Sequence, residues 1–558
     1  MHRRIIILSV LLLLISTIWW LRSAALADDV ANGIVGEAVD YQKSVNVRDL
    51  PPARSAPTLD REINPRHNPL QFSADMGKGN TWDRTDVPID PLITADQTRN
   101  AGNTPALSFS FEGTGNPVGC GSCSPPDPSG AAGPNHYVHS VNATKITIFD
   151  KQGNQLVAPF NLGTLWSSGT CRSNAGDGIV LYDESVDRWL ITQFARPTHM
   201  CLAVSQTGDP SGSYHLYTFN VGYFPDYFKF GIWPTGYFMS ANEDTYTAYA
   251  FDRTKLLAGD STASFVKHSG QTNLLLPADW DGAAAPPANT PAMFYTYKDD
   301  VRVQHNVTTD RIELYEFDID WSGPSSTFTL VSSIDVTPFT YTVCGFFNFN
   351  CVRQSGTSRR LDTISEWPMF RFAYRNFGTH EALVGNFTVG GGTGNVGASI
   401  RWFELRRAST AWSLYQEGTL DPNDGQDRWL GSISQDRYGN IALAYSVSSS
   451  SMSPSIRYAM HLAGDPLGTM RAEQTIIDGG GVQTGSNRWG DYSHLSIDPK
   501  DDCTFWYTSE YYDTNATNQW NTRVGVFKTD RCQNDFGVYR AYIPYITGKA
   551  ADIPTPFP

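Results

Sequence analysis

One phrase recurs along most of this chain: a Gly- or Asp-rich start, a short strand-like run, a polar turn, and a second run rich in aromatic and branched residues. The plainest copies span 176–194, 226–242, 428–446 and 488–511. Asp, Asn and Gly in a turn between two such runs are typical of a β-hairpin. Repetition of one hairpin unit over much of the chain predicts a repeat architecture built from strands.

The spacing of these units indicates a β-propeller. The units begin near residues 133, 177, 227, 291, 366, 428 and 488. A four-stranded propeller blade takes about 40–50 residues, and longer steps correspond to loop insertions. We therefore expect an all-β protein with seven four-stranded blades over residues 105–535, while six or eight blades remain open. Two stacked β-sandwiches are the alternative, but repeated phrases are expected of blades and not of sandwich strands.

Composition agrees with a β-rich fold and excludes one class of partner. Aromatic residues make up 13% of the chain, charged residues 18%, and the net charge is −14. Aromatic residues favour strands, and the 48 glycines suit many tight turns. Binding to nucleic acid needs a concentrated basic face, which an acidic chain without Lys/Arg-rich runs does not offer.

The ends of the chain predict export. A basic start precedes the apolar run Ile5–Leu21, and Ala25-Leu26-Ala27 supplies the small residues of a cleavage site, so we expect a signal peptide over 1–27. A retained N-terminal anchor is the alternative. We expect a secreted or surface-bound monomer with no membrane span after cleavage. Residues 28–104 are Pro- and charge-rich and predict an extended or disordered lead, and residues 536–558 form a C-terminal tail.

The eight cysteines fit an oxidising compartment. They lie in local pairs, and nearest-neighbour pairing would close four loops, although eight cysteines allow 105 connectivities. The Cys120–Cys123 pair lacks the second ligand pair that a zinc site needs, so a loop disulfide is the better interpretation. The expected pairs are Cys120 with Cys123, Cys171 with Cys201, Cys344 with Cys351, and Cys503 with Cys532.

A second repeated phrase is Gly-Asp-Pro-x-Gly-[Ser/Thr], found in 203–219 and 459–476. We expect Asp209 and Asp465 to accept backbone N–H bonds within these turns, and Gly212 and Gly468 to take a left-handed conformation. The phrase resembles the Asp-box turn of sialidase-type propeller blades, with one extra residue between Asp and Gly.

Six phrases together resemble a family of secreted bacterial β-propeller proteins that show them in the same order. They lie at 125–138, 187–195, 203–214, 370–384, 440–450 and 487–512. The resemblance covers about residues 106–535 and implies the fold and export. It implies no catalytic residues, because the activity of that family is undefined.

The sharpest enzymatic hypothesis is a sialidase-like glycoside hydrolase at the central channel. Such enzymes resemble this chain in their blade turns, and they need clustered arginines for a substrate carboxylate, a Tyr nucleophile paired with Glu, and an Asp acid/base. The candidate catalytic residues lie at or near the starts of units. They are Arg371, Arg428, Arg488, Asp491 and Tyr492, with Glu366 as the partner of the tyrosine.

The alternative is that these side chains form ion pairs between blades, because repetition at equivalent positions favours a structural role. On that interpretation the protein is an exported scaffold that binds a glycan, peptide or surface partner at the channel mouth or on a loop face. This scaffold is our preferred prediction. Its candidate binding residues at the channel mouth are Asp177, Asp226, Arg428, Arg488 and Asp491.

Two further features leave alternatives open. The aromatic insert at 335–362 is either a protruding recognition loop or a cover for a blade edge. The acidic turns 183–187 and 498–502 offer oxygen ligands for Ca²⁺. They lack the ligand spacing of a defined calcium loop, so we expect solvated turns there and no cofactor, and the scattered histidines lack the spacing of a metal site.

Overall fold

The computed structural model describes residues 33–51, 90–93, 102–121, 123–302, 305–323, 325–341, 343, 350–391 and 397–534. These residues form an almost purely β structure, in which the α-helices are α2 (Arg253–Ala258) and α3 (Asp530–Asn534). No helix in this part of the chain is long and apolar enough to cross a membrane. The predicted signal peptide and the C-terminal tail lie outside the described residues.

Antiparallel pairing sorts the described strands, β1 apart, into seven groups of four, which we call blades 1 to 7. Blade 1 contains β3 (Ser129–Ala132), β4 (His136–Val141), β5 (Lys145–Asp150) and β6 (Gln155–Asn161). Blade 2 contains β7 (Ile179–Asp183), β8 (Arg188–Ala195), β9 (His199–Ser205) and β10 (Tyr214–Asn220). Blade 3 contains β11 (Asp226–Trp233), β12 (Gly236–Asn242), β13 (Tyr246–Phe251) and β14 (Ser264–Gln271).

The remaining blades follow in chain order. Blade 4 contains β15 (Leu276–Asp281), β16 (Ala292–Lys298), β17 (Arg311–Asp320) and β18 (Ser325–Asp335). Blade 5 contains β19 (Met369–Asn376), β20 (Glu381–Gly391), β21 (Gly397–Arg407) and β22 (Ser413–Leu420). Blade 6 contains β23 (Asp427–Gln435), β24 (Ile441–Ser449), β25 (Met452–His461) and β26 (Gln474–Ile477). Blade 7 contains β27 (His494–Ile497), β28 (Phe505–Tyr511) and β29 (Asn521–Phe527), completed by β2 (Leu107–Glu112).

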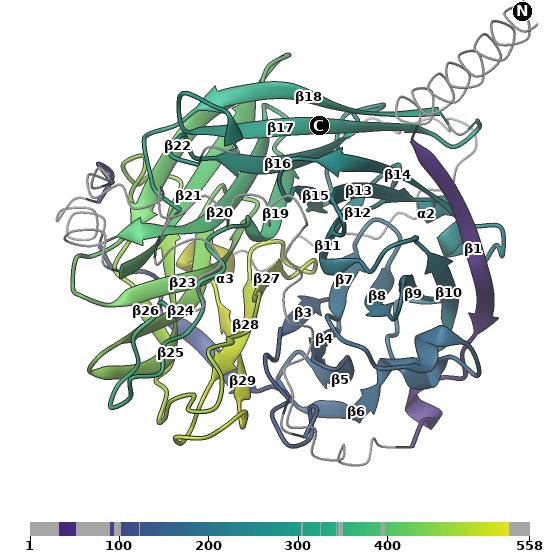
Figure 1. Ribbon diagram of the computed structural model, residues 1–558, viewed down its shortest axis with the longest axis horizontal. Helices are drawn as coiled ribbons and strands as arrows, with labels where there is room; N and C mark the ends of the chain where they lie inside the picture. The colour runs from purple at the N-terminus through teal and green to yellow at the C-terminus, as the bar shows by residue number, and fades with distance from the viewer. Residues whose placement is uncertain are drawn as a thin grey trace, which may run out of the picture.

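The first strands of the blades form a closed ring around one axis (Figure 1). Each of β3, β7, β11, β15, β19, β23 and β27 contacts the first strand of the next blade, and β27 contacts β3. The ring is closed within blade 7, where β2 pairs antiparallel with β29, so that Glu112 lies opposite Arg523. The prediction of an all-β propeller is therefore confirmed, and the alternative of two stacked sandwiches is wrong.

Packing between the faces of neighbouring blades forms the core. The strands carry large apolar side chains on both faces, because a blade is covered by the next blade on each side. Trp189 in blade 2, Trp402 in blade 5 and Trp506 in blade 7 are buried between blades. This explains why the aromatic content of the sequence was informative about the fold.

The first strand of the chain was not expected. β1 (Ile34–Lys43) lies within the 28–104 segment, for which we predicted an extended or disordered lead. It pairs antiparallel with β10 of blade 2 and with β14 of blade 3, and it thereby joins the outer edges of two blades. Figure 1 shows it at the rim of the molecule. The short 3-10 helix η1 (Val47–Asp49) follows, with Val47 buried.

The described cysteines pair as predicted. Disulfides join Cys120 to Cys123, Cys171 to Cys201, and Cys503 to Cys532. Cys344, the predicted partner of Cys351, lies outside the described residues. Disulfides of this kind persist in oxidising compartments.

The two Gly-Asp-Pro turns differ in detail. Asp209 accepts a hydrogen bond from the N–H of Ser211, and Asp465 accepts one from the N–H of Leu462. Gly468 has the predicted left-handed conformation, with φ +75°. Gly212 does not have it, so that prediction is wrong: its turn closes through the bond from Gly212 N–H to the carbonyl of Asp209.

Candidate functional site

The central channel has two ends that differ in chemistry. The inner strands run parallel to one another, as shown by the parallel pairing of β15 with β19. All inner strands therefore begin at one end of the channel and finish at the other. We call these ends the N-terminal mouth and the C-terminal mouth.

Four aspartates gather at the N-terminal mouth, one each from four consecutive blades. Asp491 belongs to blade 7, Asp127 to blade 1, Asp177 to blade 2 and Asp226 to blade 3, and all four are buried. Each stands at or just before the start of an inner strand. Asp127 and Asp177 have left-handed backbone, at φ 41° and 53°, which aspartate tolerates better than most residues. We refer to these four side chains, together with Lys229 and Arg488, as the axial cluster.

Hydrogen bonds link the axial cluster between blades. The side-chain amide of Asn142 donates to Asp127 at 2.6 Å, and the N–H of Asp491 donates to the other oxygen of Asp127 at 2.6 Å. Arg488 Nη2 donates to both oxygens of Asp491, at 2.6 and 2.5 Å. The sequence candidates Asp177, Asp226, Arg488, Asp491 and Tyr492 lie close together here. The charges of Asp226, Asp491 and Arg488 act on Asp177, and those of Asp177 and Asp491 act on Tyr492.

Lys229 is a cation that the sequence analysis missed. Its ammonium lies 3.5 Å from the centre of the Tyr227 ring and 3.9 Å from that of Tyr492, a cation–π arrangement. It also donates to the carbonyl of Phe228 at 3.1 Å. Burial lowers the pKa of Lys229 to about 8, against the opposing effect of Asp177 and the other aspartates.

Burial also raises the pKa values of two carboxyl groups in the axial cluster. It raises the pKa of Asp177 to about 7, with a further increase from the charge of Asp226. It raises the pKa of Asp127 well above its usual range, with a further increase from Asp491. Desolvation disfavours the charged form of an acid, and like charges nearby add to that effect.

The N-terminal mouth is covered by the end of the insert that precedes β19. The N–H of Asp362 bonds to the carbonyl of Asn487 in blade 7. The carbonyl of Ser365 accepts a hydrogen bond from Tyr297 in blade 4. The Trp367 ring lies 4.6 Å from that of Tyr227 in blade 3. Residues 362–367 therefore cross the mouth from blade 7 to blades 3 and 4.

The described part of the 335–362 insert packs onto the propeller as well. Phe339, Tyr341, Val352 and Leu361 are buried, and Gln354 exchanges hydrogen bonds with Gln483. The hypothesis of a protruding recognition loop is therefore wrong for these residues, because their apolar side chains cover blade surface. Residues 344–349 lie outside the described part of the chain.

The three candidate arginines do not converge. Arg371 binds Asp279 at 2.7 Å and Asp281 at 2.5 Å. Arg428 binds Asp424 at 2.8 Å and Glu473 at 3.0 Å, so it turns toward the outer strands of its own blade. Arg488 binds Asp491, as described above.

The proposed tyrosine–glutamate pair is not formed by the predicted partners either. Burial raises the pKa of Tyr297, with a smaller increase from the charge of Glu366. Burial likewise raises the pKa of Tyr492, but the nearby carboxylates that increase it further are Asp177, Asp127 and Asp491. Glu366 therefore lies beside Tyr297 rather than acting on Tyr492.

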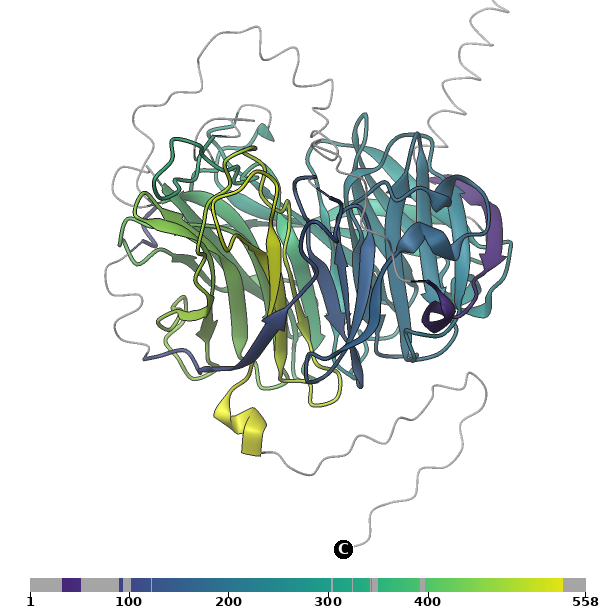
Figure 2. The same ribbon diagram turned by 90° about the horizontal axis from the view of Figure 1, so that it is seen from below.

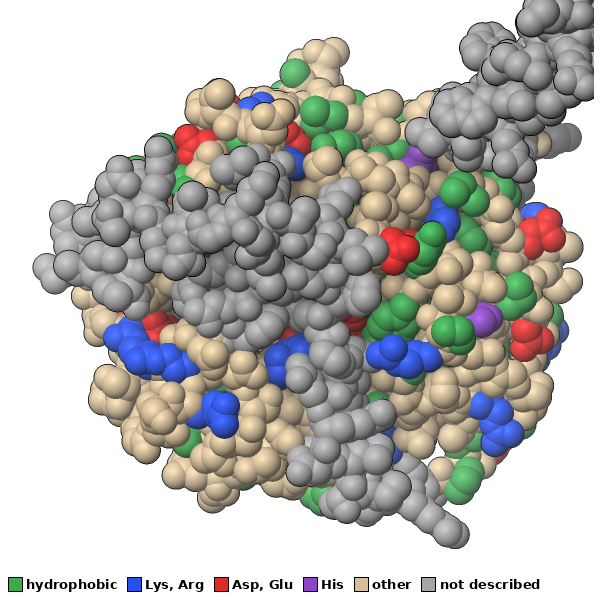
Figure 3. Space-filling model, in the orientation of Figure 1, with side chains coloured by type: hydrophobic (Ala, Val, Ile, Leu, Met, Phe, Trp, Pro, Cys, Tyr) green, Lys and Arg blue, Asp and Glu red, His purple; other side chains and the backbone are tan. Residues whose placement is uncertain are grey.

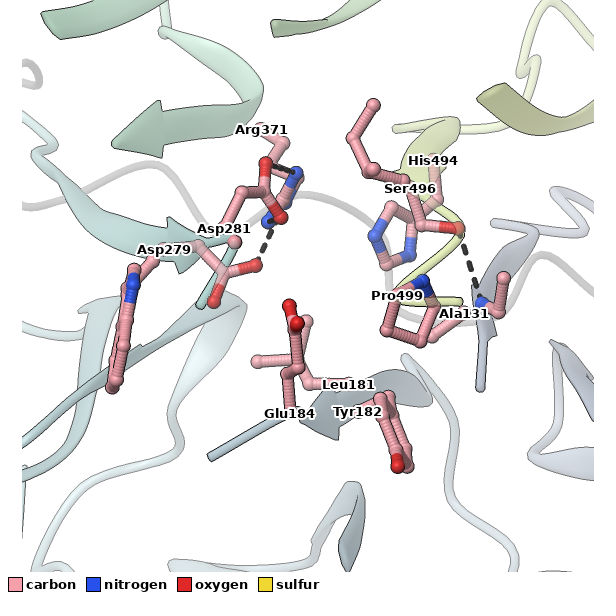
Figure 4. A pocket seen from close by; sticks show the side chains of 14 residues that line it. Ala131, Leu181, Tyr182, Glu184, Asp279, Asp281, Arg371, His494, Ser496 and Pro499 are labelled. Carbon is pink, nitrogen blue, oxygen red and sulfur yellow. Dashed lines mark hydrogen bonds and ion pairs between the residues drawn. The ribbon is translucent and has the colours of Figure 1, made fainter. Parts of the chain in front are cut away.

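A small pocket opens at the C-terminal mouth (Figure 4). It is lined by the ends of β3, β7, β15 and β27 and by Arg371 of β19. Its free volume is about 30 Å³, which holds a few water molecules but no sugar ring. In Figure 4 the Glu184 carboxylate points into this space, toward the ion pair of Arg371 with Asp281.

Burial changes the pKa values of two side chains that line this pocket, Asp279 and His494. Burial raises the pKa of Asp279 to about 6, although Arg371 acts in the opposite direction. Burial lowers the pKa of His494 well below its usual range, and its Nδ1 lies 3.2 Å from the backbone nitrogen of Gly130, which donates to it. His494 is therefore neutral and joins blades 7 and 1. It is not placed to act as a titrating base.

The acidic turns considered for Ca²⁺ are occupied by ion pairs. Asp183 binds Arg253 at 2.6 Å, Asp498 binds Lys151 at 2.8 Å, and Asp502 binds Arg375 at 2.7 Å. Elsewhere in the described chain, carboxylate oxygens of Asp299, Asp300 and Asp310 lie within 4.8 Å of one another. Asp299 and Asp310 already accept backbone N–H bonds from Tyr341 and Phe339.

Charged side chains of both signs are mixed on the face shown in Figure 3. On the described part of the face in Figure 3, Lys and Arg side chains are scattered among acidic and neutral groups, without a continuous basic patch.

The strand arrangement and the three disulfides define a disulfide-containing β-propeller protein. No family model matches the chain, and no curated protein matches it. Among solved structures it is similar to a protein of unknown function from Dyadobacter fermentans, with 10% identity, 76% of this chain and 98% of that chain covered, and a TM-score of 0.33. It is also similar to the WD40 domain of SCAP from fission yeast, with 9% identity, 72% of this chain and 95% of that chain covered, and a TM-score of 0.33. A third similar structure is an α-L-arabinofuranosidase from Clostridium thermocellum, with 9% identity, 63% of this chain and 94% of that chain covered, and a TM-score of 0.27. At these identities and TM-scores the similarities carry no information about activity.

Proposed function

We propose that this protein is an exported, non-catalytic propeller that binds a glycan at the C-terminal mouth of its channel. The observation that supports this most is the separation of the three arginines into separate ion pairs. A sialidase-like site requires several arginines on one substrate carboxylate, beside a tyrosine paired with a glutamate. Here the arginines serve the structure, and the N-terminal mouth is covered by residues 362–367.

The side chains at the C-terminal mouth suit a carbohydrate. Trp280 and Tyr182 are partly exposed, and they line the pocket together with Asp281 and Glu184. Aromatic faces stack on the apolar faces of sugars, while a few convergent polar groups fix orientation. Because the cavity is too small for a sugar ring, the ligand lies across the mouth and places at most a hydroxyl group inside.

A glycan array probed with the wild type and the Trp280→Ala variant tests this function. The wild type should bind a defined set of oligosaccharides, and Trp280→Ala should lose that binding because the stacking surface is gone. Tyr223→Ala is the matched control, since Tyr223 is 49% exposed and is not among the residues lining the pocket. Equal binding by all three proteins, or no binding by the wild type, would contradict the proposal.

One observation favours hydrolysis as the second candidate. Asp279, whose pKa is raised to about 6, lines the pocket together with Asp281 and Glu184. Acid–base catalysis on glycosides uses two carboxyl groups whose pKa values differ. A panel of fluorogenic glycosides tests it. Turnover that disappears in Glu184→Gln would favour the hydrolase over the scaffold.

A further inference from the structure

The guanidinium of Arg371, at the C-terminal mouth, is bound on all three of its nitrogens by side chains of the protein itself. Nε donates to Asp279 at 2.7 Å, and Nη1 and Nη2 donate to the two oxygens of Asp281 at 2.6 and 2.5 Å. Nη1 also donates to the Ser434 hydroxyl at 3.1 Å. Among the described residues that line the pocket, Arg371 is the only Lys or Arg. The one guanidinium of this pocket is therefore engaged before a ligand arrives.

The other partly exposed donors of this mouth are engaged as well. The Trp280 indole N–H donates to the carbonyl of Ala284 at 3.0 Å, which leaves the ring of Trp280 for stacking. The Tyr182 hydroxyl donates to Asp187 at 2.6 Å. By contrast, the carboxylate of Glu184 points into the pocket in Figure 4. An ionised carboxylate accepts hydrogen bonds and donates none, so the partly exposed polar side chains meet a ligand mainly as acceptors.

This distribution of donors and acceptors distinguishes two kinds of sugar. A sugar carboxylate that leaves water needs donors, and arginine is the residue best suited to it, because its fork matches the two oxygens. Asp281 already occupies that fork of Arg371. An acidic sugar would therefore lose hydration without gaining a partner, which is costly. A sugar hydroxyl, in contrast, can donate to the carboxylates at the mouth.

We propose that the C-terminal mouth selects neutral glycans and rejects acidic ones, because Asp279 and Asp281 occupy the arginine that would otherwise bind a ligand carboxylate. A neutral sugar stacks on Trp280 and donates hydroxyl hydrogens to the carboxylate of Glu184. The inference rests on the proposed glycan-binding function and adds to it the class of sugar.

A glycan array with matched pairs tests the selection on the wild type. Each pair has one linkage and one length, and its members differ only in CH₂OH or carboxylate at C6 of the sugar. We expect the wild type to bind the neutral member at least about tenfold more tightly than the acidic one. Equal binding within the pairs, or a preference for the acidic member, would overturn the neutral selection while leaving the glycan-binding function in place. Binding to no member of any pair would instead overturn the glycan-binding function, and the selection with it.

Asp281→Asn tests the contribution of the ion pair. The amide has nearly the same shape but no charge, so Arg371 keeps Asp279 as its one anionic partner of the two and can attract a ligand carboxylate. The preference for the neutral member should therefore fall about tenfold. Folding of the variant is checked by circular dichroism and Tm.

Asp465→Asn is the matched control, because Asp465 binds Arg471 at 2.7 Å and neither residue lines the pocket. Its preference should equal that of the wild type. A folded Asp281→Asn protein with the full preference, or an equal loss of preference in Asp465→Asn, would overturn the role given to the ion pair. If Asp281→Asn does not fold, the matched pairs on the wild type still decide the proposal.

Discussion

Arg401 shows how single residues hold this propeller together. Its guanidinium is 1% exposed and binds Asp90 at 2.7 Å and Glu417 at 2.9 Å, while Thr419 accepts a bond from Nε at 2.7 Å. Asp90 comes from the N-terminal lead and Arg401 from blade 5. A buried arginine is tolerated only with such partners, so the lead contributes to the stability of the blade.

Removing the Asp90 carboxylate tests that contribution. Asp90→Ala leaves Arg401 buried with one acidic partner instead of two, and breaking such a pair costs about 3–5 kcal/mol. Denaturation with urea measures the free energy of unfolding. Asp49→Ala is the control, because Asp49 is exposed in the same lead. Equal stability of both variants would show that the lead is not anchored at Asp90.

The buried side chain of His139 should make the free energy of unfolding depend on pH. Burial lowers its pKa to about 3, while Nε2 lies 3.0 Å from the Thr508 hydroxyl. Because the folded pKa is below the unfolded value of about 6.5, the neutral histidine favours folding above pH 6.5. That stability is lost as the pH falls, by at most about 1.4 kcal/mol per pH unit.

His139→Gln retains an amide nitrogen near Thr508 but cannot take up the proton. The free energy of unfolding should therefore fall less steeply between pH 6.5 and 4.5 in the variant than in the wild type. The difference in slope should correspond to about one proton. Identical slopes would mean that His139 titrates normally in the folded protein.

Among the elements, β1 has the most unusual position. It pairs with β10 through Ala38–Lys43 and with β14 through Ile34–Glu37. It thus covers the outer edge strands of blades 2 and 3, which would otherwise offer unpaired N–H and C=O groups. Exposed edges of this kind promote association between chains.

Deletion of residues 28–51 tests the function of β1. We expect a lower Tm and concentration-dependent self-association, detected by light scattering coupled to size-exclusion chromatography. A chain that lacks only residues 1–27 is the control. A deletion variant that stays monomeric with an unchanged Tm would show that the edges of blades 2 and 3 need no cover.

The sequence predicted some elements well and missed others for physical reasons. The hairpins at 176–194 and 428–446 are β7–β8 and β23–β24, because each has its turn residues between two adjacent strands. Blade 4 was expected to begin near 291, but its first strand is β15 at Leu276–Asp281. β15 pairs in parallel with β19 and has no tight hairpin of its own. β1 was missed because its partners are far away in the sequence, so no local pattern marks it.

At the scale of the whole molecule, the described residues of the N-terminal lead, and β2 after it, are part of the propeller. β1 joins blades 2 and 3, Asp90 reaches blade 5, and β2 completes blade 7. Figure 2 shows β2 lying along the last blade, where it closes the ring. Closure with a strand from the other end of the chain removes the free edges that an open ring would have.

The candidate site was predicted only in part at this scale. The repeated unit starts located Asp177, Asp226, Arg488 and Asp491 at one mouth, because equivalent positions of blades meet around the axis. Lys229 was missed since a lysine within a strand has no distinctive pattern. The ion pair of Arg371 with Asp279 and Asp281 was missed too, because it depends on the neighbourhood of β15 and β19 and not on any spacing in the sequence.

We expect the C-terminal mouth to bind a glycan and to leave it intact. The most direct measurement is prolonged incubation of the wild type with an oligosaccharide selected on the array, followed by calorimetry for binding and chromatography of the sugar. The wild type should bind the oligosaccharide saturably, Trp280→Ala should lose this binding, and the oligosaccharide should be recovered at its original length. Release of shorter sugars by the wild type, abolished in Glu184→Gln, would contradict it.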